Sequence, residues 1–217
     1  MHLPLVRGGL SDYDWILIVY ITGRAHNISE RALKLYGIEL WREACDASEE
    51  TVQLCGQLYA AQPDTYCAAL AHSLYNLGTV LGKLELWQEA RVTDQEAVRL
   101  HRQLYATQPD AYRANLAQSL NNFGDHLGEL ELWHEACDAV KEAIQLRQQL
   151  YATHPDAYRA DLAQSLYNFG INLAKLELWQ EACNAGEEVV QLHRQLYATQ
   201  PDAYRADLAQ SFHNLGT

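Results

Sequence analysis

The sequence predicts an all-α solenoid of stacked helical hairpins, on the strength of a repeat of constant length and of the helical spacing inside it. The segment LYAAQPD, which begins at Leu58, returns in closely similar form at steps of 46 residues, at Leu104, Leu150 and Leu196. Residues 104–149 and 150–195 are identical at 31 of 46 positions, which indicates internal duplication. Consecutive units of this length are typical of repeat proteins, in which each unit packs on its neighbours.

Within each unit the apolar residues recur at every third or fourth position, which places them on one face of a helix. In one unit the first such set is Tyr158, Leu162, Leu166, Phe169, Leu173 and Leu176. After a break, a second set is Ala182, Ala185, Val189, Leu192 and Leu196. Pro201 and Asp202 then open the next helix, because a first turn tolerates proline and favours a carboxylate near its positive end. Each unit is therefore expected to be a pair of helices.

The period divides the chain into six parts. They are an atypical N-terminal segment (1–22), a degenerate first hairpin (23–60), three repeats (61–106, 107–152 and 153–198) and the first helix of an incomplete repeat (199–217). The apolar run Trp15 to Ile21 is too short to span a bilayer, so we expect it to pack on the first repeat. The last helix has no partner helix in the sequence. Either the reading frame continues beyond it or a partner completes the array, and we expect self-association through residues 202–217.

Composition narrows the classes of function. Apolar residues make up 48% of the chain and charged residues 20%, as in ordinary folded proteins. The net charge of −12 has the wrong sign for binding nucleic acid or an anionic membrane surface. The five cysteines form no CxxC pair, which favours free thiols in a reducing compartment and a cytoplasmic location.

The residues that recur in each unit resemble a known family. Leu74 to Leu81 (LYNLGTVL), followed by Trp87, Ala90 and Ala97, resembles the tetratricopeptide repeat. Here the period is 46 residues rather than the usual figure of about 34, as in the longer variants of kinesin light chains and of fungal and bacterial signalling proteins. The glycine common at the hairpin turn of the family is replaced by Glu85, Glu131 and Glu177. The resemblance implies a fold and leaves the ligand open.

The resemblance also implies a binding surface. Members of the family bind extended peptides in a groove lined by the first helix of each hairpin, where an asparagine before the Leu-Gly pair holds the main chain of the peptide. The matching residues here are Asn76, Asn122, Asn168 and Asn214. A row of amides can donate to and accept from any peptide backbone. The alternative is that these asparagines recur only because the units are recent copies.

Neighbouring groove positions differ between the units and are the candidates for specificity. They are Tyr75, Asn121 and Tyr167 at one position, and Lys83 and Lys175 at another, where the intervening repeat has Glu129. The alternative is drift on an exposed face.

No motif in the sequence predicts catalysis, a metal or a cofactor. The run Gly78 to Leu84 superficially resembles a phosphate-binding loop, but it is one residue short, lies inside a helix and loses its lysine in the copy at Glu129. The histidines have no metal-ligand spacing. We therefore expect a non-catalytic scaffold that binds a protein or peptide. The alternative is a sensor or assembly segment of a larger signalling protein whose NTPase or protease-like domains lie outside this chain.

Overall fold

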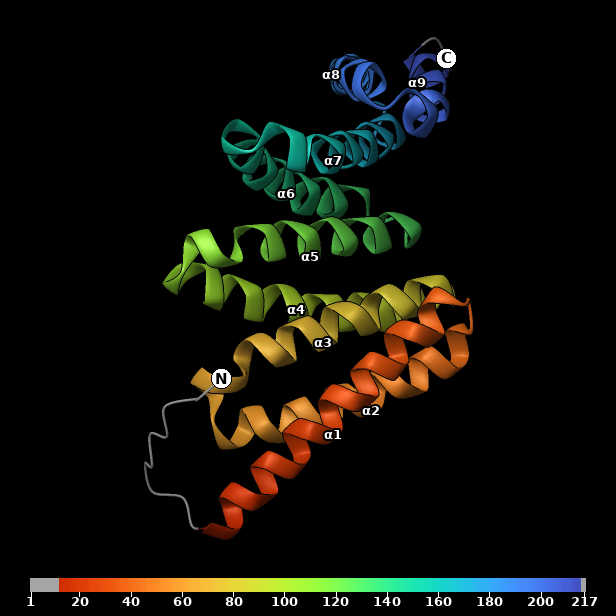
Figure 1. The fold of residues 1–217 in the computed structure, drawn as a ribbon. Helices are drawn as coiled ribbons and strands as arrows, with labels where there is room; N and C mark the ends of the chain where they lie inside the picture. The colour runs from red at the N-terminus through yellow and green to blue at the C-terminus, as the bar shows by residue number, and fades with distance from the viewer. Residues whose placement is uncertain (1–11, 216–217) are drawn as a thin grey trace.

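The computed structural model describes residues 12–215, which form nine helices and no strand (Figure 1). The bounds are α1 (Asp12–Gly37), α2 (Trp41–Ala61), α3 (Pro63–Lys83), α4 (Trp87–Thr107), α5 (Pro109–Glu129), α6 (Trp133–Thr153), α7 (Pro155–Lys175), α8 (Trp179–Thr199) and α9 (Pro201–Leu215). Each helix packs on the next one in the chain, and the layers stack along one direction (Figure 1). The predicted solenoid of helical hairpins is confirmed.

The boundary between one hairpin and the next is a single residue. Gln62, Gln108 and His154 each end an even-numbered helix, and a proline opens the following odd-numbered helix in its first turn. Proline at this point loses no hydrogen bond, since the first N–H groups of a helix have no partner inside the helix. An aspartate follows each proline and interacts favourably with the positive end of the helix dipole.

The turn inside each hairpin has one residue in a left-handed conformation. This residue is a glutamate in every described hairpin, with φ values of 61° at Glu39, 59° at Glu85, 60° at Glu131 and 60° at Glu177. Around Glu85 the N–H of Leu86 donates to the carbonyl of Leu81 at 3.0 Å, and the N–H of Glu85 donates to that of Gly82 at 3.1 Å. These two bonds form a Schellman motif, which satisfies the last carbonyls of the helix and turns the chain sharply.

The apolar interior is divided among successive layers. One cluster of buried residues spans the four helices α1, α2, α3 and α4 and includes Ala25, Leu54 and Leu100. Another spans α4, α5 and α6 through Val98, Leu120 and Ala143. In a solenoid of this kind, stability is close to a sum of contacts between adjacent units.

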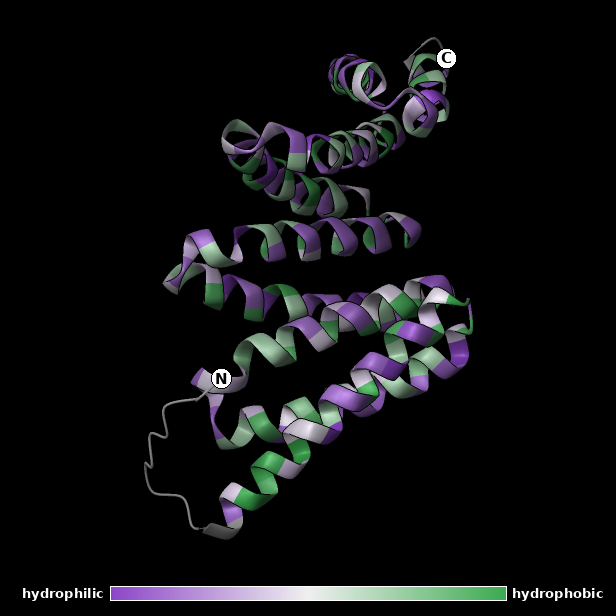
Figure 2. Cartoon of the chain, in the orientation of Figure 1, coloured by the Kyte–Doolittle hydropathy of each residue, from purple (hydrophilic) through white to green (hydrophobic). Residues whose placement is uncertain are grey.

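The apolar N-terminal run lies within α1, which continues without a break past residue 22. Ile18 is buried and Ile21 packs against the first cluster, while Ile16, Leu17 and Val19 are exposed. Figure 2 shows that much of the N-terminal half of α1 is hydrophobic. None of the helices in residues 12–215 is both long and apolar enough to cross a membrane.

Candidate functional site

The odd-numbered helices carry all of the groove residues that the sequence predicts. These helices form a layer of their own. α3 contacts α5 directly and α5 contacts α7 directly, although an even-numbered helix separates each pair in the sequence. Tyr75, Asn76 and Lys83 lie on α3, Asn121 and Asn122 on α5, Tyr167, Asn168 and Lys175 on α7, and Asn214 on α9. The fold therefore places the predicted set on one layer of helices, although not all of these side chains face the surface.

Two of the four asparagines tie neighbouring odd-numbered helices together. Asn122 Nδ2 donates to Thr79 Oγ1 at 3.0 Å, and Asn168 Nδ2 donates to Asp125 Oδ1. In both cases the acceptor lies three residues after the asparagine of the preceding repeat. A further bond, 2.6 Å from Gln118 Nε2 to Tyr75 Oη, joins α5 to α3. We call these three bonds the inter-repeat rungs.

The two outer asparagines face a different environment. The residue that corresponds to Thr79 and Asp125 is Leu33 in the first repeat and Ile171 in the last, so an apolar side chain stands where the rungs have an acceptor. Asn76 lines a cavity beside Leu33, and Asn214 lines a second cavity beside Ile171. Asn214 Oδ1 accepts a hydrogen bond from Gln210 Nε2 at 2.6 Å.

The remaining predicted residues have distinct roles in the structure. Asn121 is buried rather than presented at the surface, and it donates to Asp125 Oδ2 at 3.1 Å and accepts from Ser165 Oγ at 2.7 Å. Tyr167 packs against the cluster that joins α6, α7 and α8. Lys83 is exposed, and Lys175 Nζ lies 5.7 Å from the ring centre of Trp133, a cation–π contact.

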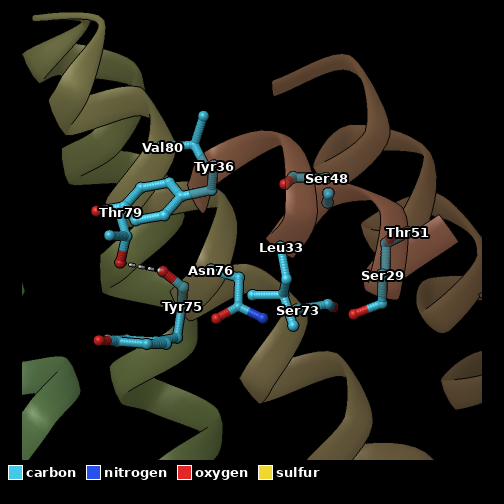
Figure 3. A pocket seen from close by; sticks show the side chains of 11 residues that line it. Ser29, Leu33, Tyr36, Ser48, Thr51, Ser73, Tyr75, Asn76, Thr79 and Val80 are labelled. Carbon is cyan, nitrogen blue, oxygen red and sulfur yellow. Dashed lines mark hydrogen bonds between the residues drawn. The ribbon is translucent and has the colours of Figure 1, made fainter. Parts of the chain in front are cut away.

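The cavity beside Asn76 has a volume of about 240 Å³ and lies between α1, α2 and α3 (Figure 3). Its lining is Ser29, Ala32, Leu33, Tyr36, Ser48, Thr51, Ser73, Tyr75, Asn76, Thr79 and Val80. We call it the first-repeat pocket. The hydroxyls of Thr51 and Ser73 donate to the carbonyls of Ala47 and Leu70 at 2.8 and 2.9 Å. No charged side chain is part of the lining.

The equivalent space between α3, α4 and α5 is filled by side chains of the chain itself. Asp94 and His126 stand 46 residues after Ser48 and Val80, and both are buried. His126 Nδ1 lies 2.6 Å from Asp94 Oδ2, a hydrogen bond. Two glycines make room for this pair: a Cβ at Gly78 would lie 1.9 Å from Asp94 Oδ1, and one at Gly82 would lie 2.3 Å from His126 Nε2.

The third and fourth repeats complete the series. Val140 takes the position of Asp94 in the third repeat, and a Cβ at Gly124 would lie 2.3 Å from its Cγ2. The fourth repeat has Gly186 there, beside a second cavity of about 680 Å³ that Ile171 and Trp179 also line. The residue at this one position thus differs in every repeat, and where it is small the structure has a cavity.

A row of buried serines in the odd-numbered helices pairs with variable polar residues of the even-numbered helices. Ser119 Oγ lies 2.8 Å from His101 Nδ1 and Ser211 Oγ lies 2.6 Å from His193 Nδ1, while Ser165 Oγ accepts from the guanidinium of Arg147. Burial lowers the pKa of His101 to about 4 and also lowers the pKa of Arg147.

Burial raises the pKa values of two carboxylates, those of Asp94 and Asp125. It raises the pKa of Asp125 to about 7, although Asn168 donates to this carboxylate. It also raises the pKa of Asp94, against the opposing effect of the hydrogen bond from His126. Sequence reasoning missed Asp94, His126 and Arg147. The sequence contained a signal for two of them. Asp94 stands where sister repeats have Val140 and Gly186, and Arg147 stands where a sister repeat has Cys55.

Among the residues that the structure describes, no group of three or more histidine, cysteine, aspartate or glutamate side chains is placed to hold a metal ion. The five cysteines are free thiols, and only Cys183 is exposed.

Comparison with known proteins supports the fold and the repeat. The family model described as Tetratricopeptide repeat matches residues 70–110 and again residues 116–156. No curated protein matches the chain. The fold is similar to the crystal structure of BtubC (BKLC) from P. vanneervenii, with a TM-score of 0.68 and 20% identity over 91% of this chain and 72% of that one.

A second similar structure is the MamA RS-1 ArsTM double mutant, with a TM-score of 0.51 and 17% identity over 90% of this chain and 92% of that one. At these identities the likeness concerns the fold alone. Repeats of the matched family are protein-interaction scaffolds. The family model thus matches two repeats of this chain, and the described structure continues the same helical hairpins on either side of them.

Proposed function

We propose that the chain is a non-catalytic scaffold that binds an extended peptide segment of another protein along the layer of odd-numbered helices. The observation that supports this most is the layer in which α3 contacts α5 and α5 contacts α7, since these helices carry Asn76, Asn122 and Asn168 at the same position of each repeat. A preformed surface of this kind lowers the cost of ordering a flexible ligand. Its amide and hydroxyl groups can pair with a peptide main chain.

The inter-repeat rungs support the proposal in a second way. They hold the odd-numbered helices at fixed spacing before any ligand arrives, because each rung joins side chains from adjacent repeats. The rungs also distinguish the asparagines from one another. Asn122 and Asn168 order the surface, whereas Asn76 lines a cavity in it.

The test is selection of binders from a random peptide library on the purified chain, followed by affinity measurement with two matched variants. Ile171→Asp places a carboxylate on the odd-numbered layer, and Val92→Asp places one on α4, at side chains that are 40% and 62% exposed. We expect the first variant to weaken the selected peptides about tenfold, because burying an unpaired charge under a ligand is costly. The second should leave their affinity unchanged. An equal loss of affinity in both variants would contradict the proposal, and so would peptides whose affinity neither variant changes.

Self-association is a second candidate activity, favoured by the apolar surface at the C-terminal end of the described chain. Ile171, Trp179 and Phe212 are exposed there, and the first two line the second cavity. Such a patch favours contact with another apolar surface. We expect Trp179→Ser to lower any oligomer population seen by sedimentation velocity at high protein concentration. A strictly monomeric parent chain would rule this activity out.

A further inference from the structure

We propose that the apolar run at the N-terminal end of α1 docks into the second cavity, between α7, α8 and α9, of another copy of this chain. Successive copies then stack head to tail. This inference rests on the self-association described above as a second candidate activity, and it names the two surfaces that meet. It does not depend on peptide binding along the odd-numbered layer.

The first surface is the N-terminal end of α1, where large apolar side chains are exposed. Ile16, Leu17, Val19 and Tyr20 are each 55–68% exposed, and of their neighbours Ile18 is buried. Helix α1 has 26 residues whereas α2 has 21, and in Figure 1 the N-terminal end of α1 extends past the end of α2. Exposed apolar side chains that cluster in this way mark an interaction surface.

The second surface is the cavity at the other end of the array. Trp179 lines it and is 62% exposed. In two preceding hairpins the equivalent tryptophan contacts the next odd-numbered helix, since the rings of Trp87 and His126 are 5.8 Å apart and Lys175 Nζ lies 5.7 Å from the ring of Trp133. The cavity measures about 680 Å³. Hollows of about 300–1,000 Å³ enclose ligands of many atoms, so several apolar side chains fit this one.

The position of the two surfaces requires a second molecule. Figure 1 shows α1 in the first layer of the array and α8 and α9 in the last. Within one described chain α1 packs on α2, and α8 packs on α7 and α9, so the two surfaces meet only between copies. Because they differ from each other, every copy keeps one free surface of each kind. Such a contact produces open chains rather than closed dimers.

Charge favours contact at these two surfaces over the rest of the molecule. The net charge of −12 makes two copies repel each other. Residues 15–23 contain no charged side chain, and neither does the lining of the second cavity. Contact between them therefore removes apolar groups from water without burying an unpaired charge. A basic partner, which the net charge attracts elsewhere, finds no opposite charge at either surface.

The test is complementation between two variants. Ile16→Asp places a carboxylate on the run of α1, and Trp179→Asp places one at the cavity. We expect the parent chain to form oligomers at high concentration in sedimentation velocity, and each variant alone to associate at least about tenfold more weakly, because the contact would bury an unpaired charge. An equimolar mixture should form dimers and nothing larger, since each pair keeps one intact run and one intact cavity.

Two control variants are matched in exposure. Ile38→Asp lies at the other end of α1, at a side chain that is 66% exposed against 68% for Ile16. Val92→Asp lies on α4, at a side chain that is 62% exposed, as Trp179 is. Both controls should associate like the parent chain. A monomeric mixture of the two test variants would overturn the inference, and so would a Trp179→Asp chain that associates as strongly as the parent.

Cys183 gives a second measurement of the same contact. It lines the second cavity and is the exposed one among the five free cysteines. In the variant Leu17→Cys, air oxidation catalysed by copper phenanthroline should join Cys183 of one copy to the cysteine introduced at position 17 of the next. Mass spectrometry of the joined peptides identifies this link. The variant Ile38→Cys should not form its counterpart, and links between two copies of Cys183 alone would contradict the contact.

These outcomes separate the inference from the proposed functions. Parent oligomers that Trp179→Ser lowers and Ile16→Asp leaves intact would support self-association through the C-terminal layers and reject the contact with α1. Library peptides whose affinity Ile16→Asp does not change, together with failed complementation, would support peptide binding and reject head-to-tail stacking. Complementation without any library binder would support stacking alone.

Discussion

The asparagine that recurs in each repeat has a different environment from one unit to the next. The four asparagines are 46 residues apart, so the sequence predicts one shared role for them. Their environments differ because each faces a residue 43 positions earlier in the chain, which is Thr79 for Asn122 and Asp125 for Asn168. That pairing depends on how adjacent repeats are stacked, which no pattern within one repeat reveals. The sequence therefore predicts one role for all four positions and cannot distinguish their environments.

Removing the amide should have different consequences in the two environments. Asn168→Ala leaves the partly buried carboxylate of Asp125 without the donor that reaches it from α7, and we expect the free energy of unfolding to fall by about 1–2 kcal/mol. Asn76→Ala is the matched control, and we expect it to change stability by less than about 0.5 kcal/mol. Urea denaturation followed by circular dichroism measures both. A larger loss for Asn76→Ala than for Asn168→Ala would contradict these roles.

The stability of the chain should depend on pH through Asp125. Its pKa is raised from 3.8 to about 7 in the folded state, so between those values the folded chain binds a proton that the unfolded chain lacks. Stability from this group therefore increases as pH falls from 7 toward 4, by at most about 1.4 kcal/mol per pH unit. The lowered pKa of His101 acts in the opposite direction as pH falls below 6.5.

Asp125→Asn separates the two effects, because it removes the first and keeps the second. The unfolding free energy of the parent chain minus that of the variant should be larger at pH 5 than at pH 8, by at least about 1 kcal/mol. Parallel curves for the two proteins would show that Asp125 titrates normally.

At the scale of elements, the sequence predicts the helices well because their boundaries have local chemical causes. Proline at the start of α3, α5 and α7 and the apolar spacing inside them are visible without the structure. The turns are less obvious, since Glu85 adopts a left-handed conformation that usually favours glycine. Here the turn is imposed by the Schellman bonds and by the packing of the two helices that it joins.

The strain at this turn can be measured. A left-handed conformation costs a residue with a side chain about 1–2 kcal/mol, so Glu85→Gly should stabilise the chain by about 1 kcal/mol. Glu187→Gly, in the interior of α8, should destabilise it by a similar amount, because glycine is a poor helix former. Thermal unfolding of the two variants tests the contrast. The prediction fails if both glycines destabilise the chain.

Glycines inside the odd-numbered helices should also respond differently according to their layer. A Cβ at Gly78 would meet Asp94 at 1.9 Å, while one at Gly170 would have its nearest contact at 3.7 Å. Gly78→Ala should therefore destabilise the chain by about 2 kcal/mol or more, and Gly170→Ala should stabilise it by up to about 1 kcal/mol. Melting temperatures of the two single variants decide this, and equal signs would contradict the packing described.

At the scale of the whole molecule, the repeat is what made the fold predictable. Each helix contacts mainly its neighbours in the chain, so a pattern of 46 residues contains nearly all of the information that the architecture needs. The cavities could not be predicted in the same way. They arise from differences such as Ser48 against Asp94, and the volume that such a difference opens depends on three helices at once.

The arrangement of rungs predicts how stability is distributed along the array. The rungs join α3 to α5 and α5 to α7, whereas cavities lie between α1 and α3 and between α7 and α9. A solenoid can unfold locally, one layer at a time. The layers with the fewest contacts therefore have the lowest free energy of opening, and their amide hydrogens exchange fastest. We expect amides of α4, α5 and α6 to exchange most slowly under native conditions, and those of α1 and α9 to exchange fastest.

Hydrogen–deuterium exchange with mass spectrometry measures this order, and the variant Asn122→Ala/Asn168→Ala tests its cause. Two of the three rungs are lost in that variant, so protection of α5 should fall toward that of α1, while protection of α1 itself should not change. If α5 kept its protection, apolar packing alone would hold the central layers together, and the asparagines would then be available to a ligand in every repeat. The same measurement thus decides whether Asn122 and Asn168, like Asn76, are available to a ligand.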